Sequence, residues 1–282
     1  MSQFDFKPQG MPHKSKEEID RELSITESLN RIKNTILVMS GKGGVGKSSV
    51  AVNLALALAK KGFKVGLMDI DIHGPDVPRM LGKKNDLLNT NNAQKLVPIE
   101  YNQNLKFVSM ESLMPKKDDA VIWRGPMKHS IIKQFIGDVN WGDLDYLIID
   151  APPGTGDEPL TIAQTVRKAE ALIVTTPQEI SLADVRKSIA FCKTINLDII
   201  GIVENMSDTI CPHCGKEIKL FGSGGGEKMA NAYSLRFLGK IPFESDVVTC
   251  GDAGVPLIEK HPDSPASQAF NKITDSIAKL KG

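Results

Sequence analysis

The sequence contains few aromatic residues, which make up 5% of its 282 residues. Surfaces that bind nucleic-acid bases need aromatic rings for stacking, so this scarcity counts against such a surface. Neither sign of charge dominates, because 35 lysines and arginines are balanced by 34 aspartates and glutamates. Without a basic excess, the simplest electrostatic attraction to a phosphate backbone is missing. We therefore expect no nucleic-acid partner.

Cysteine is also scarce, and no long apolar run occurs. Of the four cysteines, only Cys211 and Cys214 lie close together, which excludes a disulfide framework and suits a reducing compartment. No signal-peptide pattern opens the sequence, and no run of about eighteen apolar residues could span a bilayer. The basic end at residues 279–281 is too short for an amphipathic membrane anchor. We expect a cytoplasmic protein with no membrane partner.

Hydrophobic residues make up 41% of the chain, which is enough for the core of one large α/β domain. From residue 36 onward, short apolar runs alternate with helical patterns. This alternation predicts a doubly wound, mostly parallel sheet flanked by helices, with ligands at the carboxyl ends of its strands. The predicted strands cover residues 36–39, 65–69, 105–109, 146–150, 171–175, 199–204 and 237–241. The predicted helices cover residues 48–61, 127–136, 159–166, 182–195, 226–233 and 266–280.

Residues 1–30 differ from the rest of the chain in being polar and rich in mixed charge. They predict a flexible extension that contains one short helix between Lys16 and Ile32. Residues 31–282 are expected to form a single domain. Within it, residues 83–104 are rich in Asn, Lys and Gln and are expected to form a surface excursion.

Residues 41–48, GKGGVGKS, fit the pattern G-x-x-x-x-G-K-[ST] of a P-loop NTPase and stand between a predicted strand and a predicted helix. Glycines let backbone N–H groups surround phosphate oxygens, and the helix N-terminus adds positive potential. Lys47 is expected to neutralise the β- and γ-phosphates, and Ser48 to bind Mg²⁺. The alternative is a glycine-rich turn without a ligand. The predicted nucleotide contacts in this loop are Gly41, Lys42, Gly43, Gly44, Val45, Gly46, Lys47, Ser48 and Ser49.

Three aspartates stand at or just beyond the ends of predicted strands. Asp150 ends a strongly apolar strand, where a carboxylate is costly to bury unless it meets a cation. We expect it to hold Mg²⁺ through water. Asp69 and Asp71 follow the second strand and should lie near the mouth of the phosphate-binding loop. The alternative for these two is a cap on the turn before Gly74 and Pro75.

Residues 205–208, NMSD, follow another predicted strand and are similar to the guanine-binding motif N-K-x-D. Met206 stands where that motif has its lysine. The departure favours ATP over GTP, with Asn205 contacting the base.

A C-x-x-C turn places Cys211 and Cys214 within reach of one metal ion. The pair supplies only half of a four-ligand site, and Cys192 and Cys250 are far off in sequence. Two copies of the pair in a symmetric homodimer would complete a set of four thiolates. Three alternatives remain open at this point, namely a structural zinc site, a redox pair and no metal at all.

With its second lysine, Lys42, the loop resembles the deviant Walker A loop of the MinD, ParA and nitrogenase-iron-protein class of NTPases. The resemblance implies that Lys42 reaches across a dimer to the partner's nucleotide; the alternative is a solvated loop lysine. It also implies that Asp71 helps to activate the attacking water and that Asp69 binds Mg²⁺ or senses phosphate. Residues 151–157, APPGTGD, resemble switch II of this class, in which Gly154 would offer its N–H to the γ-phosphate.

Taken together, the motifs resemble the Mrp/ApbC family over roughly residues 30–280. They are the segments 41–48, 69–75 (DIDIHGP), 151–157, 203–207 (VENMS), 211–215 (CPHCG) and 221–228 (FGSGGGEK). The resemblance implies a slow cytosolic ATPase with Lys42, Lys47 and Asp71 as catalytic residues. It further implies a homodimer that binds a [4Fe–4S] cluster through Cys211 and Cys214 and transfers it to apo iron–sulfur proteins.

On this interpretation, residues 31–282 are the ATPase domain, and the cysteine segment is an insertion at about 205–226. The chain departs from eukaryotic scaffold relatives, which have a further N-terminal cluster of four cysteines, and from bacterial relatives with an additional N-terminal domain. A minimal carrier of archaeal or bacterial type therefore fits best. The rival interpretations are a partitioning or positioning ATPase of the ParA or MinD kind and an ATPase with a structural zinc.

Overall fold

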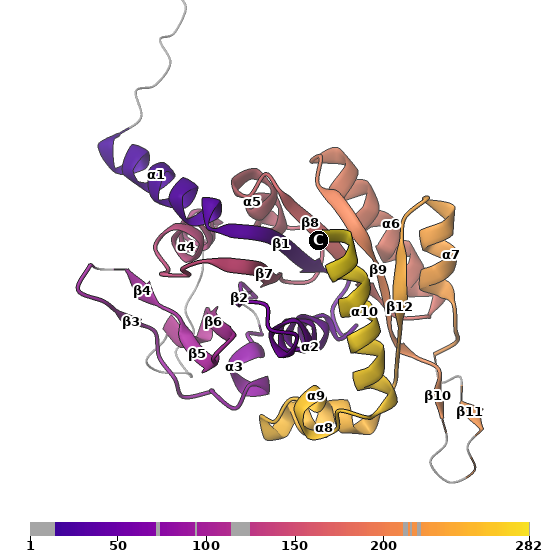
Figure 1. Cartoon of the computed structure of the whole chain (residues 1–282). Helices are drawn as coiled ribbons and strands as arrows, with labels where there is room; N and C mark the ends of the chain where they lie inside the picture. The colour runs from indigo at the N-terminus through magenta and orange to yellow at the C-terminus, as the bar shows by residue number, and fades with distance from the viewer. Residues whose placement is uncertain are drawn as a thin grey trace, which may run out of the picture.

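The computed structural model describes residues 15–71, 74–93, 95–113, 125–210, 214, 216–218 and 221–281. Eight strands of this described part form the main sheet, and they are β1 (Ile32–Met39), β2 (Val65–Asp69), β5 (Ile99–Asn102), β6 (Leu105–Ser109), β7 (Leu144–Asp150), β8 (Ala169–Thr175), β9 (Asp198–Ser207) and β12 (Phe237–Pro242). Their order across the sheet is β12-β9-β8-β1-β7-β2-β6-β5 (Figure 1). All neighbours pair in parallel except β5 and β6, which pair antiparallel at one edge.

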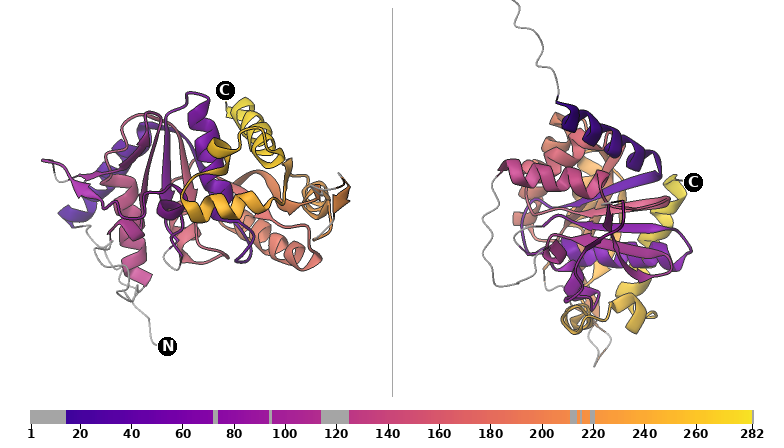
Figure 2. Two further views of the ribbon diagram at one scale, coloured as in Figure 1. Left: turned by 90° about the horizontal axis from the view of Figure 1, so that it is seen from below. Right: turned by 90° about the vertical axis from the view of Figure 1, so that its left-hand side faces the viewer.

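Helices cover both faces of the sheet (Figure 2). One face is covered by α2 (Lys47–Lys60), α3 (Val77–Met80), α8 (Ser245–Ala253), α9 (Leu257–Lys260) and α10 (Pro265–Lys281). The other face is covered by α1 (Lys16–Asn30), α4 (Gly125–Gly137), α5 (Asp157–Thr165), α6 (Glu179–Thr194) and α7 (Gly225–Ala232). Within the described residues, no helix combines the length and the apolar character that crossing a bilayer requires.

The alternation of side chains along β1 explains why there are two helix layers. Ile36 and Val38 pack in the core on the α2 side, whereas Leu37 and Met39 pack in the core on the α4 side. All four are fully buried, as expected for a strand covered on both faces. The continuous apolar runs of the sequence therefore reflect two cores that share one sheet.

Short elements complete the fold. A turn of 3-10 helix, η1 (Glu111–Leu113), follows β6, and two small hairpins pair β3 (Asn89–Thr90) with β4 (Leu96–Val97) and β10 (Thr209–Ile210) with β11 (Glu217–Ile218). Figure 1 shows β10 and β11 extending from the body of the molecule below β12.

The predicted architecture is confirmed: all seven predicted strands and all six predicted helices are present, with ends that shift by a few residues. The expected excursion at 83–104 contains β3, β4 and the edge strand β5. Helices α8 and α9 were not predicted, because Gly251, Gly254 and Pro256 interrupt their helical pattern.

The short helix expected in the N-terminal extension is α1, and it packs against α4. Ser15 and Glu18 form a reciprocal capping box at its start. Ile25 is buried, and the Ser24 hydroxyl donates to the Gly137 carbonyl oxygen at 2.8 Å. Residues 1–14 lie outside the described residues.

Candidate nucleotide-binding site

The loop after β1 turns sharply into α2 at the centre of the sheet, where the strand order reverses direction. Gly44 and Gly46 both have φ of +79°, a left-handed conformation that favours glycine. A Cβ on Gly46 would lie 2.2 Å from Asn205 Nδ2, and a Cβ on Gly41 would lie 2.3 Å from the carbonyl oxygen of Asp184 in α6. The loop is thus held between β9 and α6, and neither position has space for a side chain.

A cavity of about 570 Å³ lies over this loop. Its lining joins the loop to the ends of β2 and β7 and consists of Ser40, Lys42, Gly43, Gly44, Val45, Gly46, Lys47, Ser48, Ser49, Asp71, Gly74, Asp76, Met80, Pro152, Pro153 and Met206. Eight of the nine predicted loop contacts border it, and Gly41 lies behind them against α6. The Lys42 side chain is half-buried at its rim and makes no ion pair with another described residue.

Lys47 lies at the base of this cavity in a buried cluster of charges. Its Nζ atom donates to Asp150 Oδ1 at 2.6 Å and lies 3.8 Å from Asp71 Oδ2. The side chains of Lys47, Asp71 and Asp150 are 7%, 10% and 0% exposed, so these charges interact with little screening by water. The Lys47 ammonium also reaches the Ser48 hydroxyl at 3.4 Å.

Asp69 adds a third carboxylate beneath this cluster. The register of β2 on β7 places it opposite Asp150, and it accepts hydrogen bonds from the Asp71 N–H at 3.1 Å and from Ser109 Oγ at 2.9 Å. Complete burial and the charge of Asp150 raise the pKa of Asp69 well above its usual value. Burial also raises the pKa of Asp150, although Lys47 and Ser48 oppose this effect. The site therefore favours added positive charge.

The residues present fit a magnesium ion. Asp150 Oδ2 is buried and has no hydrogen-bond partner among the described residues. A buried carboxylate oxygen without a partner is costly, and a cation removes that cost. Ser48 supplies a hydroxyl beside it, and carboxylate, hydroxyl and phosphate oxygens are the ligands that Mg²⁺ prefers.

The segment after β7 connects this cluster to α5. Gly154 adopts a φ of +96°, and its N–H donates to the Ser40 carbonyl oxygen at 2.8 Å. Glu158, in the first turn of α5, is buried and accepts a hydrogen bond from Lys128 Nζ of α4 at 2.8 Å. That ion pair connects the start of α5 to α4.

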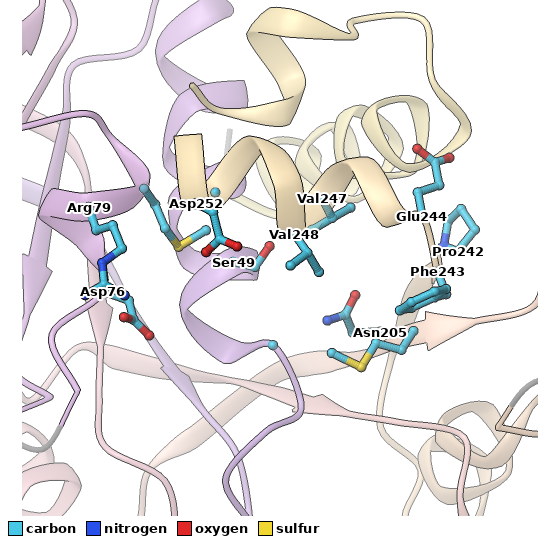
Figure 3. A pocket seen from close by; sticks show the side chains of 14 residues that line it. Ser49, Asp76, Arg79, Asn205, Pro242, Phe243, Glu244, Val247, Val248 and Asp252 are labelled. Carbon is cyan, nitrogen blue, oxygen red and sulfur yellow. The ribbon is translucent and has the colours of Figure 1, made fainter. Parts of the chain in front are cut away.

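A second cavity of about 330 Å³ opens beside the first and shares Gly46, Ser49, Asp76, Met80 and Met206 with it. Figure 3 shows Asn205 and Phe243 on one side of this cavity and Val247 and Val248 of α8 on the other. Its wall is mainly apolar with a few polar groups, which suits the base and ribose of a nucleotide.

Asn205, which was predicted to contact the base, lies in this second cavity. Its Nδ2 donates to the Val45 carbonyl oxygen at 2.9 Å, which leaves its Oδ1 as the acceptor. Analysis of the sequence missed Pro242, Phe243 and α8 as parts of the wall. The one available signal was that β12 ends at the same edge of the sheet as the phosphate-binding loop.

The cysteines fall into two groups. Cys192 and Cys250 are buried, and burial raises the pKa of the Cys192 thiol to about 12 and also raises that of Cys250. Both are therefore unreactive packing residues. Cys214 is exposed beyond β10, and Cys211 lies outside the described residues. Within the part of the chain that the structure covers, no three His, Cys, Asp or Glu side chains are placed to hold a metal by themselves.

Comparison with known proteins identifies the family. The family model for the ParA-type NUBPL iron-transfer P-loop NTPases matches residues 31–278 of the sequence. The chain belongs to this family. One relative is the iron–sulfur cluster carrier protein of Saccharolobus solfataricus, which is 49% identical over 92% of this chain and 88% of its own length. Another is the cytosolic Fe–S cluster assembly factor CFD1 of Kluyveromyces lactis, which is 47% identical over 90% of this chain and 94% of its own.

A solved structure extends this family assignment to three dimensions. It is the nucleotide-binding protein of Archaeoglobus fulgidus in complex with ADP, which is 39% identical to this chain and superposes on it with a TM-score of 0.75. The match covers 86% of this chain and 94% of the Archaeoglobus fulgidus chain. The likeness confirms the P-loop NTPase fold. The predicted resemblance to iron–sulfur carriers is thereby confirmed at the level of the family.

Proposed function

We propose that the chain is a cytoplasmic ATPase that, as a homodimer, carries a [4Fe–4S] cluster and transfers it to apo iron–sulfur proteins. The observation that carries this proposal is the combination of a P-loop over a buried lysine–aspartate cluster with a separate pair of cysteines, in a family of iron-transfer NTPases. The cytosolic relative in Kluyveromyces lactis and the carrier in Saccharolobus solfataricus support the location and the cargo.

Hydrolysis in this proposal depends on positioning and charge. Backbone N–H groups of residues 43–48 hold the phosphates, and Lys47 moves its ammonium from Asp150 to the β- and γ-phosphate oxygens. Ser48 and Asp150 would hold Mg²⁺, with Asp69 behind them, and when bound the ion would supply positive charge beside the phosphate oxygens. Asp71 orients the attacking water. The Gly154 N–H gives up its hydrogen bond to the Ser40 carbonyl oxygen and donates to the γ-phosphate instead.

The base is expected to be adenine. The Val45 carbonyl fixes the Asn205 amide so that its Oδ1 accepts, which suits the amino group of adenine and repels the carbonyl oxygen of guanine. We therefore expect kcat/KM for ATP to exceed that for GTP at least about tenfold, since a mismatched buried acceptor costs over 1 kcal/mol. Equal values for the two nucleotides would contradict this assignment of Asn205.

Two incomplete groups support the proposed dimer. Lys42 borders the phosphate cavity without an ion pair to another described residue, which suits a role at the nucleotide of a partner subunit. The cysteine pair supplies two of the four thiolates that a [4Fe–4S] cluster needs. A two-fold axis would complete both groups in one arrangement.

Metal analysis of anaerobically purified protein tests the cargo. We expect iron and sulfide at about four atoms of each per dimer, and their loss in both Cys211→Ser and Cys214→Ser. Cys192→Ala is the matched control, because this buried thiol packs against Met39 and should leave the iron content unchanged. Zinc without sulfide would refute the carrier and favour the structural zinc, whereas retention on DNA or on lipid vesicles would favour a partitioning ATPase.

A further inference from the structure

Glu204 is a buried carboxylate to which the proposed function assigns no role. It lies near the end of β9, is fully buried, and accepts three hydrogen bonds. The donors are Ser207 Oγ at 2.8 Å, the Gly224 N–H at 3.1 Å and the Gly226 N–H at 2.7 Å. A buried carboxylate is retained only where such partners compensate for its lost hydration, so the arrangement depends on all three donors.

These donors belong to the two ends of the segment that carries the cysteine pair. Ser207 is the last residue before this segment leaves the sheet, and Gly224 and Gly226 are where it returns and α7 begins. A second connection lies beside the first, since Ser223 Oγ donates to an oxygen of Asp208 and accepts from Lys240 Nζ at 3.1 Å. Glu204, together with the neighbouring contact of Ser223 with Asp208, therefore holds the start of the cysteine segment close to its end.

Two of the glycines at 222–226, Gly224 and Gly226, are explained by this contact. Gly224 has a φ of +79°, and a Cβ on Gly226 would lie 3.1 Å from Glu204 Cβ and 3.3 Å from Thr175 Cγ2. The backbone approaches so closely that its N–H groups can reach the carboxylate. Glycine at positions 224 and 226 thus lets the backbone bind the Glu204 carboxylate.

The next residue on the strand faces the nucleotide site. Side chains alternate along β9, so Glu204 points to the α7 side while Asn205 points to the α2 side and donates to the Val45 carbonyl oxygen of the phosphate-binding loop. Met206 follows with a φ of +53°, unusual for a residue other than glycine, and lines both cavities. If nucleotide binding shifts this end of β9, the Asn205 contact with the phosphate-binding loop and the Glu204 contact with the start of α7 would move together.

We propose that Glu204 is a positioning residue that couples the nucleotide site to the cysteine segment, so that nucleotide binding at Asn205 changes the spacing of the two ends of that segment. This inference rests on the proposed function, which gives the cysteine segment its cargo and the coupling its use. It does not need a cluster to be present, because every contact that carries it is between protein groups.

Hydrogen exchange of metal-free full-length protein, with and without Mg²⁺ and a non-hydrolysable ATP analogue, tests the coupling. In the wild type, the analogue should change exchange at residues 207–210 and 221–226, beyond the residues that line the cavity, by at least about fivefold, in the range of ordinary allosteric couplings. In Glu204→Gln this change should fall to less than about twofold, while protection of the phosphate-binding loop and the Kd of the analogue persist. Glu227→Gln, an exposed carboxylate in the first turn of α7, is the matched control and should behave as wild type.

Ser207→Ala, which removes one donor of three, gives a second variant if Glu204→Gln fails to fold, and should show an intermediate change. An undiminished response in Glu204→Gln, or in Ser207→Ala where only that variant folds, would overturn the proposal. Loss of analogue binding in Glu204→Gln would also overturn the proposal, because Glu204 would then stabilise the nucleotide site itself. No response in the wild type would also overturn it, whereas a wild type that responds but binds no iron would refute only the proposed cargo.

Discussion

At the scale of single residues, the nucleotide site places three carboxylates around one lysine. Lys47 pairs with Asp150 and lies close to Asp71, whereas Asp69 accepts hydrogen bonds from Ser109 Oγ and from the Asp71 N–H. Burying this excess of negative charge costs free energy of folding. In the proposed function, binding of Mg²⁺ would recover that cost, so the residues that lower the stability of the metal-free protein would also strengthen binding of the ion.

Asp69→Asn should stabilise the metal-free protein. Because burial and Asp150 raise the pKa of Asp69, its folded form holds a proton more tightly than its unfolded form. The free energy of unfolding should therefore fall as pH rises from the ordinary value of 3.8 towards the raised value. The free energy of unfolding of the variant should not fall in this way, and at neutral pH it should exceed that of the wild type by on the order of 1 kcal/mol. The ATP turnover of the variant should decrease. Urea unfolding of both proteins across pH measures this; equal pH profiles would contradict it.

Lys47→Ala should lose both stability and turnover. Removing the ammonium leaves Asp150 buried without a cation, at a cost of about 3 kcal/mol, and should lower ATP turnover a hundredfold or more, to roughly background. The double variant Lys47→Ala/Asp150→Asn separates these effects, since it removes the unpaired charge. We expect it to regain most of the free energy of unfolding but none of the turnover. A double variant as unstable as the single one would show that the ion pair is not the cause.

At the scale of elements, the first helix of the described chain is held by specific contacts. The sequence predicted a flexible extension, and its composition gives no sign that Ile25 is buried against α4. Periodicity could locate the helix, because capping and spacing are local properties. It could not locate the partner, because Gly137 of α4, whose missing side chain admits Ile25, is over a hundred residues away in sequence.

Ile25→Ala should loosen α1. Truncating this buried side chain should cost about 2 kcal/mol and raise hydrogen exchange across residues 16–30. Leu23→Ala, two residues away, is the control, since Leu23 is 56% exposed and its truncation should change stability by less than about 0.5 kcal/mol. If both variants exchange like the wild type, α1 is not held in solution by the packing of Ile25.

At the scale of the whole molecule, the proposed dimer predicts that each nucleotide site contains residues from two subunits. Lys42 would act at the partner's nucleotide, whereas Asp71 would act at the nucleotide of its own subunit. Either single substitution then inactivates every site of its homodimer.

Mixing two inactive variants tests this arrangement. Lys42→Ala and Asp71→Asn should each be nearly inactive but bind ATP, and their equimolar mixture should recover about a quarter of wild-type turnover. The reason is that half of the dimers are mixed, and each mixed dimer has one site with Asp71 and a partner's Lys42. ATP hydrolysis assays of the separate and mixed proteins measure it. A mixture as inactive as its components would show that Lys42 does not act across an interface.

The sequence by itself determined the phosphate-binding loop, the alternating strands and helices, and the carboxylates at the strand ends. Each of these depends on neighbouring residues, because glycines permit the left-handed backbone angles that the loop needs and burial on both faces demands apolar residues. Only the tertiary structure decided that Lys47 pairs with Asp150, that the Asn205 side chain donates to the Val45 carbonyl oxygen, and that α8 forms part of the wall of the second cavity. Those groups are 103 and 160 residues apart in the first two cases, and their distances follow from the order of strands in the sheet.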